Sequence, residues 1–287
     1  MVALEYWLFR SLIGLLRHLP LPAAHLLARG IARLFDRVVP RLRRVAVGNL
    51  ALAGFGNCPD IIDGVFESLA RLLVAFARFP DIDAGNIREW IRYDGFEHYE
   101  EAKRRGRGVL FATGHLGNWE LSAYAHALLT EPMNVMVRPL DNARIDEFVE
   151  RRRALSGNRI ITKKDAARTI LRALAANEAV GILVDQNSML NEGVFIDFFG
   201  VPACTNAAFV RLAAHSGATV IPGFALWSRE ERRYVLRFYP PVEMTGDVVA
   251  DTRRLHSVIE QVIREYPDQW LWIHRRWNTR PPSERRL

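Results

Sequence analysis

The residues best suited to chemistry form one short block between a strand-like run and a helix-like run. Apolar and β-branched residues at 109–113 lead directly into Gly-His-Leu-Gly-Asn-Trp-Glu at 114–120. Residues five apart in a regular helix do not face each other, so His115 and Glu120 can meet only if His115 lies in the turn before the helix. The two glycines of the block make such a turn easy.

The chemistry that this block predicts is general-base catalysis. A carboxylate bonded to one imidazole nitrogen fixes the tautomer and raises the basicity of the other nitrogen, so His115 can take a proton from a hydroxyl group. A metal site is the weaker alternative, because no third His or Cys ligand lies nearby. No Ser or Cys stands in a Gly-x-Ser-x-Gly nucleophile elbow, which disfavours a covalent acyl-enzyme.

The elements that must position the block alternate between strand-like and helix-like patterns after Pro80. Strands are expected at 109–113, 134–137, 159–162, 180–184, 219–226 and 234–238, and helices near 119–129, 145–155, 165–176 and 206–215. This alternation predicts an α/β fold with a mixed, mostly parallel sheet flanked by helices. Functional sites in such folds gather at the carboxyl ends of the strands.

The N-terminal segment has a different pattern. Residues 4–19 form a wide apolar face with a narrow basic stripe, and a second helix follows with basic residues every four positions. These helices are interpreted either as amphipathic helices lying on a membrane or as core-packing helices with solvated arginines. We expect a membrane-associated helical segment over residues 1–58 and one α/β domain over 59–287. Only 11 residues separate Arg17 from Arg29, fewer than the roughly 18 to 20 apolar residues of a spanning helix.

Composition and charge narrow the class of protein. The chain has 287 residues, of which 49% are hydrophobic and 25% charged, as in a globular protein, and its net charge is +7. Residues 1–44 hold eight arginines and two acidic residues, and residues 270–287 hold five arginines and one. An anionic partner near the termini is expected. Nucleic acid is disfavoured because no recognition motif is present and the charge lies beside apolar helices. Two cysteines and no visible signal peptide indicate a cytoplasmic protein.

The chain resembles a known family in four ordered blocks. His115 to Glu120 resembles the HX4(D/E) motif of the lysophospholipid acyltransferase superfamily. The complete block GHLGNWE is similar to the corresponding block of the lipid A late acyltransferases, one branch of that superfamily. The further blocks are Val137–Asn142, then Asp185-Gln186 with Gly193 and Phe198–Pro202, and finally Gln269–Trp277. The resemblance runs from about residue 6 to about residue 282, and it implies a glycerolipid acyltransferase-like fold.

The resemblance implies an O-acyltransferase. Such an enzyme moves a fatty acyl chain from acyl carrier protein or acyl coenzyme A to a hydroxyl of an anionic, Kdo-bearing lipid A precursor. It needs no metal, cofactor or covalent intermediate, and it acts at the cytoplasmic face of the bacterial inner membrane, peripherally or through an N-terminal anchor. The alternatives are another glycolipid or lysophospholipid as acceptor, or an inactive lipid-binding relative.

The resemblance also assigns roles to residues. His115 is the general base, Glu120 orients it, and Arg138 binds the phosphate of the acceptor or stabilises the oxyanion, unless it is a plain surface residue. Asn118, Asp185 and Gln186 are the remaining substrate-binding candidates. Asp185 and Gln186 follow an apolar strand, so a turn or capping role is equally open for them, and Asn118 with Trp119 is expected to shape the turn and an apolar wall.

Three other features have two interpretations each. The Phe198-Phe199-Gly200 block belongs either to the core or to the acyl-binding side. The C-terminal tryptophans are Trp270, Trp272 and Trp277. They either anchor the chain at a membrane interface together with Arg275 and Arg276, or pack in a final helix or strand that leaves the two arginines solvated. The basic runs 151–153 and 103–107 either receive an acidic carrier protein or are solvated faces.

Overall fold

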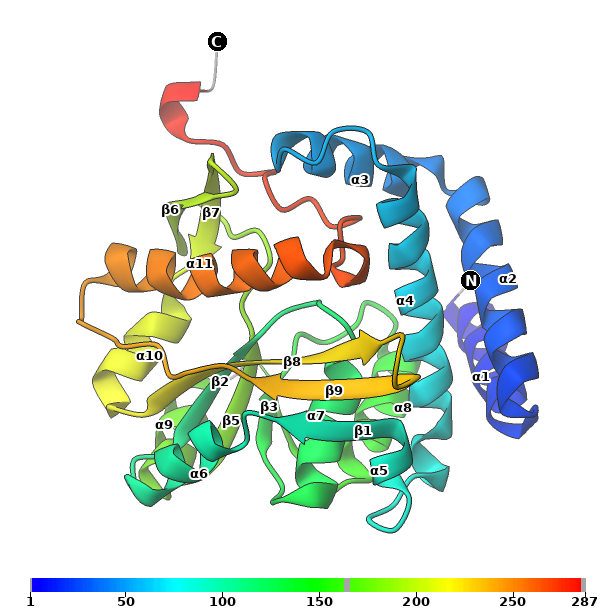
Figure 1. Cartoon of the computed structure of the whole chain (residues 1–287), viewed down its shortest axis with the longest axis horizontal. Coiled ribbons are helices and arrows are strands. Elements are labelled where there is room, and N and C mark those ends of the chain that lie inside the picture. Colours follow the sequence, from blue (N-terminus) through cyan, green and yellow to red (C-terminus); the bar gives the residue numbers. More distant parts are fainter. Residues whose placement is uncertain (1, 163–165, 285–287) are drawn as a thin grey trace.

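A seven-stranded sheet forms the centre of the computed structural model, which describes residues 2–162 and 166–284 (Figure 1). The strands run in the order β1-β9-β8-β2-β5-β3-β4. Their bounds are β1 Ile91–Asp94, β2 Val109–Thr113, β3 Asn134–Met136, β4 Arg159–Ile161, β5 Ala179–Leu183, β8 Thr219–Ser228 and β9 Arg233–Phe238. The five strands from β8 to β4 are mutually parallel, and β9 pairs antiparallel with β8, so the predicted mixed, mostly parallel sheet is confirmed.

Alternating side chains give the sheet two buried faces. On β2, Leu110 and Ala112 belong to one apolar cluster, whereas Val109 and Phe111 belong to the other, as the period of two in a strand requires. Helices cover the first face with α9 Ala166–Ala175, α10 Ala208–Ser216 and α11 Val248–Glu265, and the second with α6 Glu97–Arg104, α7 Trp119–Leu129 and α8 Ala143–Ala154. Asp165, where we expected α9 to begin, lies outside the described residues.

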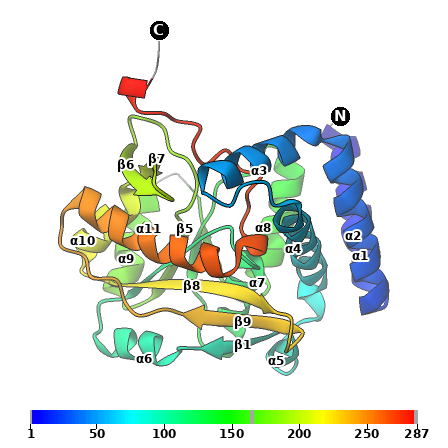
Figure 2. The ribbon, with the colours of Figure 1, turned by 45° about the horizontal axis from the view of Figure 1, so that its top comes forward.

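Four N-terminal helices pack at one side of the sheet, where α1 and α2 lie together in both views (Figures 1 and 2). They are α1 Val2–His18, α2 Leu21–Val38, α3 Pro40–Leu52 and α4 Pro59–Arg78. Their inner faces join the cores through side chains such as Ile13 and Leu16, which are fully buried. Their outer faces leave Trp7, Leu8 and Leu26 more than half exposed. Within the described part of the chain, no helix combines the length and apolarity that crossing a membrane requires.

Several elements were not predicted from the sequence. The short helix α5 Ile87–Trp90 precedes β1, and the hairpin of β6 Gly193–Phe198 and β7 Val201–Asn206 forms a separate antiparallel pair. Trp270, Trp272 and Trp277 are at most 5% exposed. The packed interpretation of these tryptophans is therefore confirmed, and the interfacial one is wrong. Of the two arginines expected to be solvated, Arg275 is exposed, whereas Arg276 is buried and donates to the carbonyl of Cys204 at 2.8 Å.

Candidate active site

The parallel register of β2 and β5 brings His115 next to Asp185. Thr113 is paired with Leu183, so the residues two positions further along each strand lie opposite each other. The Nδ1 atom of His115 is 2.9 Å from Oδ1 of Asp185, and its backbone N–H donates to Oδ2 at 2.8 Å. Both oxygens of one buried carboxylate thus hold the imidazole and the loop that carries it.

The C-terminal segment closes this loop from the other side. The indole N–H of Trp270 donates to Oδ2 of Asp185 at 2.8 Å. The backbone N–H of Leu271 donates to the carbonyl of His115 at 3.0 Å, and the N–H of Gly117 donates to the carbonyl of Gln269 at 3.0 Å. Residues about 150 positions apart in sequence therefore form one hydrogen-bonded frame around the imidazole.

Two glycines are required by this geometry. Gly117 has a φ of +66°, and a Cβ there would lie 2.0 Å from the carbonyl oxygen of Ala225. A Cβ on Gly114 would lie 3.1 Å from Cγ of Asp185, closer than most Cβ contacts allow. The turn predicted from these glycines is confirmed. Because neither glycine has a side chain, the turn can lie directly against the backbone of β8 and the carboxylate of Asp185.

The electrostatics favour a basic imidazole. Burial lowers the pKa of His115, but the adjacent Asp185 carboxylate and the charge of Glu120 outweigh burial, so the pKa is raised above its ordinary value of 6.5. Burial raises the pKa of the Asp185 carboxyl, but His115 and the hydrogen bond from Trp270 hold that pKa well below 3.8. Asp185 is therefore ionised at neutral pH, and it stabilises a proton on His115.

The other imidazole nitrogen faces the accessible side of the site. When Nδ1–H donates to Asp185, Nε2 carries the lone pair, and the side-chain amide of exposed Gln186 lies 3.2 Å from it. A hydroxyl group that took the place of this amide would lie at the basic nitrogen. Gln186 thus reaches the site as expected.

The expectation that Glu120 orients His115 by direct contact is wrong. The Glu120 carboxylate instead forms a two-fold ion pair with Arg153 of α8, at 2.8 Å from Nε and 2.5 Å from the guanidinium end. Both partners are largely buried. Asp185 has the orienting position, and Glu120 acts on His115 through its charge.

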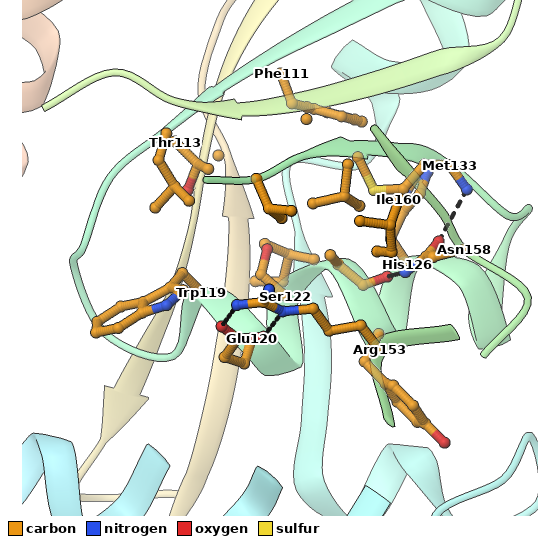
Figure 3. Close-up of a pocket in the computed structure, with 18 of the residues that line it drawn as sticks. Phe111, Thr113, Trp119, Glu120, Ser122, His126, Met133, Arg153, Asn158 and Ile160 are labelled. Atoms are coloured by element: carbon orange, nitrogen blue, oxygen red, sulfur yellow. Dashed lines mark hydrogen bonds and ion pairs between the residues drawn. The ribbon is translucent and has the colours of Figure 1, made fainter. Parts of the chain in front are cut away.

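A narrow apolar pocket leads away from the site between the sheet and α7 (Figure 3). Its free volume is about 60 Å³. Trp119, whose ring lies 5.0 Å from that of His115, is at one end, and His126 and Met133 are at the other. The Glu120 and Arg153 side chains lie between these ends. The pocket is therefore separated from the imidazole by the Trp119 ring, which contacts both.

Two further candidates lie away from the imidazole. Asn118 is fully buried and caps α7 by accepting a hydrogen bond from the N–H of Leu121 at 3.0 Å, which agrees with the expectation that it shapes the turn. Arg138 follows β3, is exposed, and makes no hydrogen bond or ion pair within residues 2–162 and 166–284. The structure does not bring it into contact with His115.

The two phenylalanines of the Phe198-Phe199-Gly200 block lie in the core. Phe198 and Phe199 are buried against Trp270 and Trp277, so the core interpretation of this block is confirmed. In the described chain, no group of three or more His, Cys, Asp or Glu side chains could hold a metal ion.

Arg153, which pairs with Glu120 and lines the pocket, is a site residue that the sequence analysis missed, because it was grouped with its neighbours as a charge run. It lies four positions after buried Val149 on α8, so helical periodicity alone places both on the inward face. Trp270 was quoted within a motif, but nothing in its local sequence indicates a bond to Asp185.

An α/β fold with a histidine–carboxylate pair at the ends of parallel strands, beside an apolar pocket, defines a class of protein suited to transferring groups with hydrocarbon chains. A family model for the bacterial lipid A biosynthesis acyltransferase matches residues 1–279. The chain therefore belongs to the bacterial lipid A biosynthesis acyltransferase family and is an O-acyltransferase.

Individual relatives agree with this membership. The chain is similar to the lipid A biosynthesis palmitoleoyltransferase of Escherichia coli (29% identity, 99% of this chain and 95% of the relative). It is also similar to the lauroyltransferase of the same organism (28%, 96% and 92%). A lipid A biosynthesis acyltransferase of Haemophilus influenzae is 25% identical over 78% of this chain and 71% of its own length.

Proposed function

We propose that this enzyme transfers a fatty acyl chain from a thioester of acyl carrier protein or coenzyme A to a hydroxyl of a Kdo-bearing lipid A precursor. The observation that carries the proposal is the imidazole of His115, which is held at Nδ1 by buried Asp185 and has Nε2 on the accessible side. The Escherichia coli relatives, a palmitoleoyltransferase and a lauroyltransferase by name, support acyl donors of this kind.

The reaction proceeds by direct transfer within a ternary complex. The acceptor hydroxyl replaces the Gln186 amide at Nε2 of His115, and its oxygen attacks the thioester carbonyl carbon as Nε2 takes its proton. The C–S bond then breaks, and the proton on Nε2 passes to the departing thiolate. The products are an ester, a free thiol and a neutral imidazole. No cofactor takes part, and Asp185 stays ionised and stabilises the transient imidazolium.

The apolar pocket takes the acyl chain of the donor. Its lining is mostly aliphatic and aromatic, with the Glu120–Arg153 ion pair and a few other polar side chains, and it includes Trp119, whose ring lies beside the imidazole of His115. Flexible Met133 at the far end can change its rotamer to lengthen the free space. The ion pair of Glu120 and Arg153 joins α7 to α8 across the pocket, so Glu120 serves as a positioning residue for the chain channel.

The enzyme works at a membrane surface. Twelve of the seventeen exposed large apolar side chains in the described chain lie on α1, α2 and α3. This concentration supports peripheral attachment at the cytoplasmic face of the inner membrane, where an amphiphilic acceptor is embedded. Arg138, exposed and unpaired in the described chain, is available to the phosphate of the acceptor.

The test is an acyl-transfer assay in detergent with the purified full chain. Labelled acyl carrier protein and acyl coenzyme A are offered with a Kdo-bearing lipid A precursor, a lysophospholipid and a mannosylated lipid, each with wild type and His115→Ala. We expect transfer to the lipid A precursor, and a loss of about a hundredfold or more in the variant. Transfer only to another acceptor would overturn the proposed substrate. Absence of any transfer that depends on His115 would overturn the mechanism and favour a lipid-binding role.

A further inference from the structure

A second cavity, distinct from the active-site pocket, lies between α1 and α8. Its volume is about 670 Å³. The two helices are joined beside it by a hydrogen bond from Asn142 to the carbonyl of Val2 (2.9 Å) and by an edge contact of Phe9 with Phe148 (5.7 Å). The groove is lined from α1 by Tyr6, Trp7, Arg10, Gly14, Arg17 and His18, and from α8 and its end by Arg144, Glu147, Phe148, Arg151, Arg152 and Leu155.

The groove has an excess of positive charge that the described protein does not neutralise. Arg17 is paired with Asp81 and Arg151 with Glu147. Arg10, Arg144 and Arg152 have no carboxylate partner within the described chain. Arg10 lies over the Trp7 ring and bonds to the Tyr6 hydroxyl, while Arg152 donates only to the carbonyls of Phe76 and Ala77.

The shape of the groove leaves room for a ligand. Among the α1 residues that line it, Trp7, Arg10, Gly14 and Arg17 are spaced three or four apart, with Tyr6 and His18 beside the first and last of them, so they form a single stripe along the helix. Gly14 is in the middle of this stripe, and a Cβ there would have no heavy atom within 4 Å. The missing side chain at this position therefore keeps the floor of the groove open.

Exposed apolar side chains continue from the basic groove along α1. Trp7 and Leu8 are 54% and 63% exposed, and Leu4 and Leu15 are similarly uncovered. An acidic soluble protein would neutralise the arginines but would not require the exposed apolar side chains. An anionic lipid accounts for both features, because its phosphate pairs with the arginines and its acyl chains contact the apolar side chains.

We propose that the α1–α8 groove binds the phosphate headgroup of an anionic membrane glycerophospholipid. Arg10 and Arg144 contact the phosphate, and Trp7 with the exposed leucines of α1 enters the acyl region. Binding there fixes which side of the enzyme faces the bilayer. This site is separate from the transfer reaction, so it stands or falls independently of the proposed acceptor.

The experiment is flotation of the full chain with vesicles of phosphatidylcholine alone or of phosphatidylcholine mixed with phosphatidylglycerol. We expect wild type to prefer the anionic vesicles and to lose that preference at high salt. Arg10→Gln and Arg144→Gln each weaken binding to anionic vesicles about fivefold, and binding to neutral vesicles is unchanged. Gly14→Leu, which fills the groove without changing charge, also removes much of the preference.

The matched control is Arg211→Gln, which removes the same charge from exposed α10 and leaves binding unchanged. Circular dichroism of each variant establishes that it is folded. If the control loses as much binding to anionic vesicles, or if the Gly14 and arginine variants keep the wild-type preference for these vesicles, net charge alone drives attachment. Either result would overturn the proposal that the groove binds the phospholipid. Loss of binding to acyl carrier protein with vesicle binding intact would also overturn it, in favour of a carrier-docking surface.

Discussion

Asp185 does two things with one carboxylate. Oδ1 bonds to the imidazole of His115, while Oδ2 accepts from the backbone of His115 and from the indole of Trp270. Three donors satisfy an anion that would otherwise be costly to bury. The residue thus sets both the position of the loop and the basicity of the imidazole.

Replacing Asp185 with Asn tests this double role. The amide keeps the size of the side chain but removes the charge that raises the pKa of His115 most, so burial is less opposed and that pKa falls relative to wild type. Because the base must be neutral, the acid limb of kcat/KM moves to lower pH, and kcat falls about a hundredfold or more. The measurement is a pH profile of wild type and variant. An acid limb at the same pH in both proteins would contradict the assignment.

At the scale of elements, β5 and α7 form opposite walls of the apolar pocket. Gly181 on β5 lines it, and a Cβ at this position would lie 2.7 Å from the terminal methyl group of Met133. That methyl group is the end of a flexible side chain, so the added carbon displaces it rather than breaking the strand. The length of the pocket is therefore adjustable by a single methyl group.

Gly181→Ala is expected to shorten the preferred acyl chain. The assay compares kcat/KM for a series of acyl thioesters of increasing length, and the optimum of the variant lies at shorter chains than that of wild type. Gly30→Ala on α2, where a Cβ meets nothing within 4 Å, is the control for a glycine substitution outside the pocket. If both variants keep the wild-type optimum, the chain does not occupy this pocket.

Across the whole molecule, each face of the sheet buries one neutral histidine. Burial lowers the pKa of His126 to about 4 on the α7 side, and that of His256 to about 4 on the α11 side. Unfolding restores ordinary values near 6.5, so the unfolded chain binds more protons between these limits. The free energy of unfolding is therefore expected to fall as pH decreases from about 6.5 to about 4.

Urea denaturation at pH 7 and pH 5 measures this loss. The raised pKa of His115 opposes it, since that group binds its proton more tightly in the folded state. His126→Phe removes one of the two buried groups and is expected to reduce the difference between the two pH values. A difference as large as that of wild type would mean that His126 does not titrate on unfolding.

The sequence predicted the sheet because apolar β-branched runs and helical periods are local signals. It also placed His115 in a turn, since the flanking glycines permit little else. It assigned the wrong carboxylate, because the choice between Glu120 and Asp185 depends on the register of β2 and β5 and on Arg153 holding Glu120. Register and long-range pairing are properties of the assembled fold.

The late position of Trp270 in the chain has a consequence for synthesis. Strands β2 and β5 leave the ribosome well before the segment that bonds to Asp185 and to the His115 loop. Domains begin to fold during translation from the N-terminal side. The imidazole consequently acquires all of its hydrogen bonds only when the polypeptide is nearly complete, so a nascent chain on the ribosome contains His115 before it contains the groups that orient it.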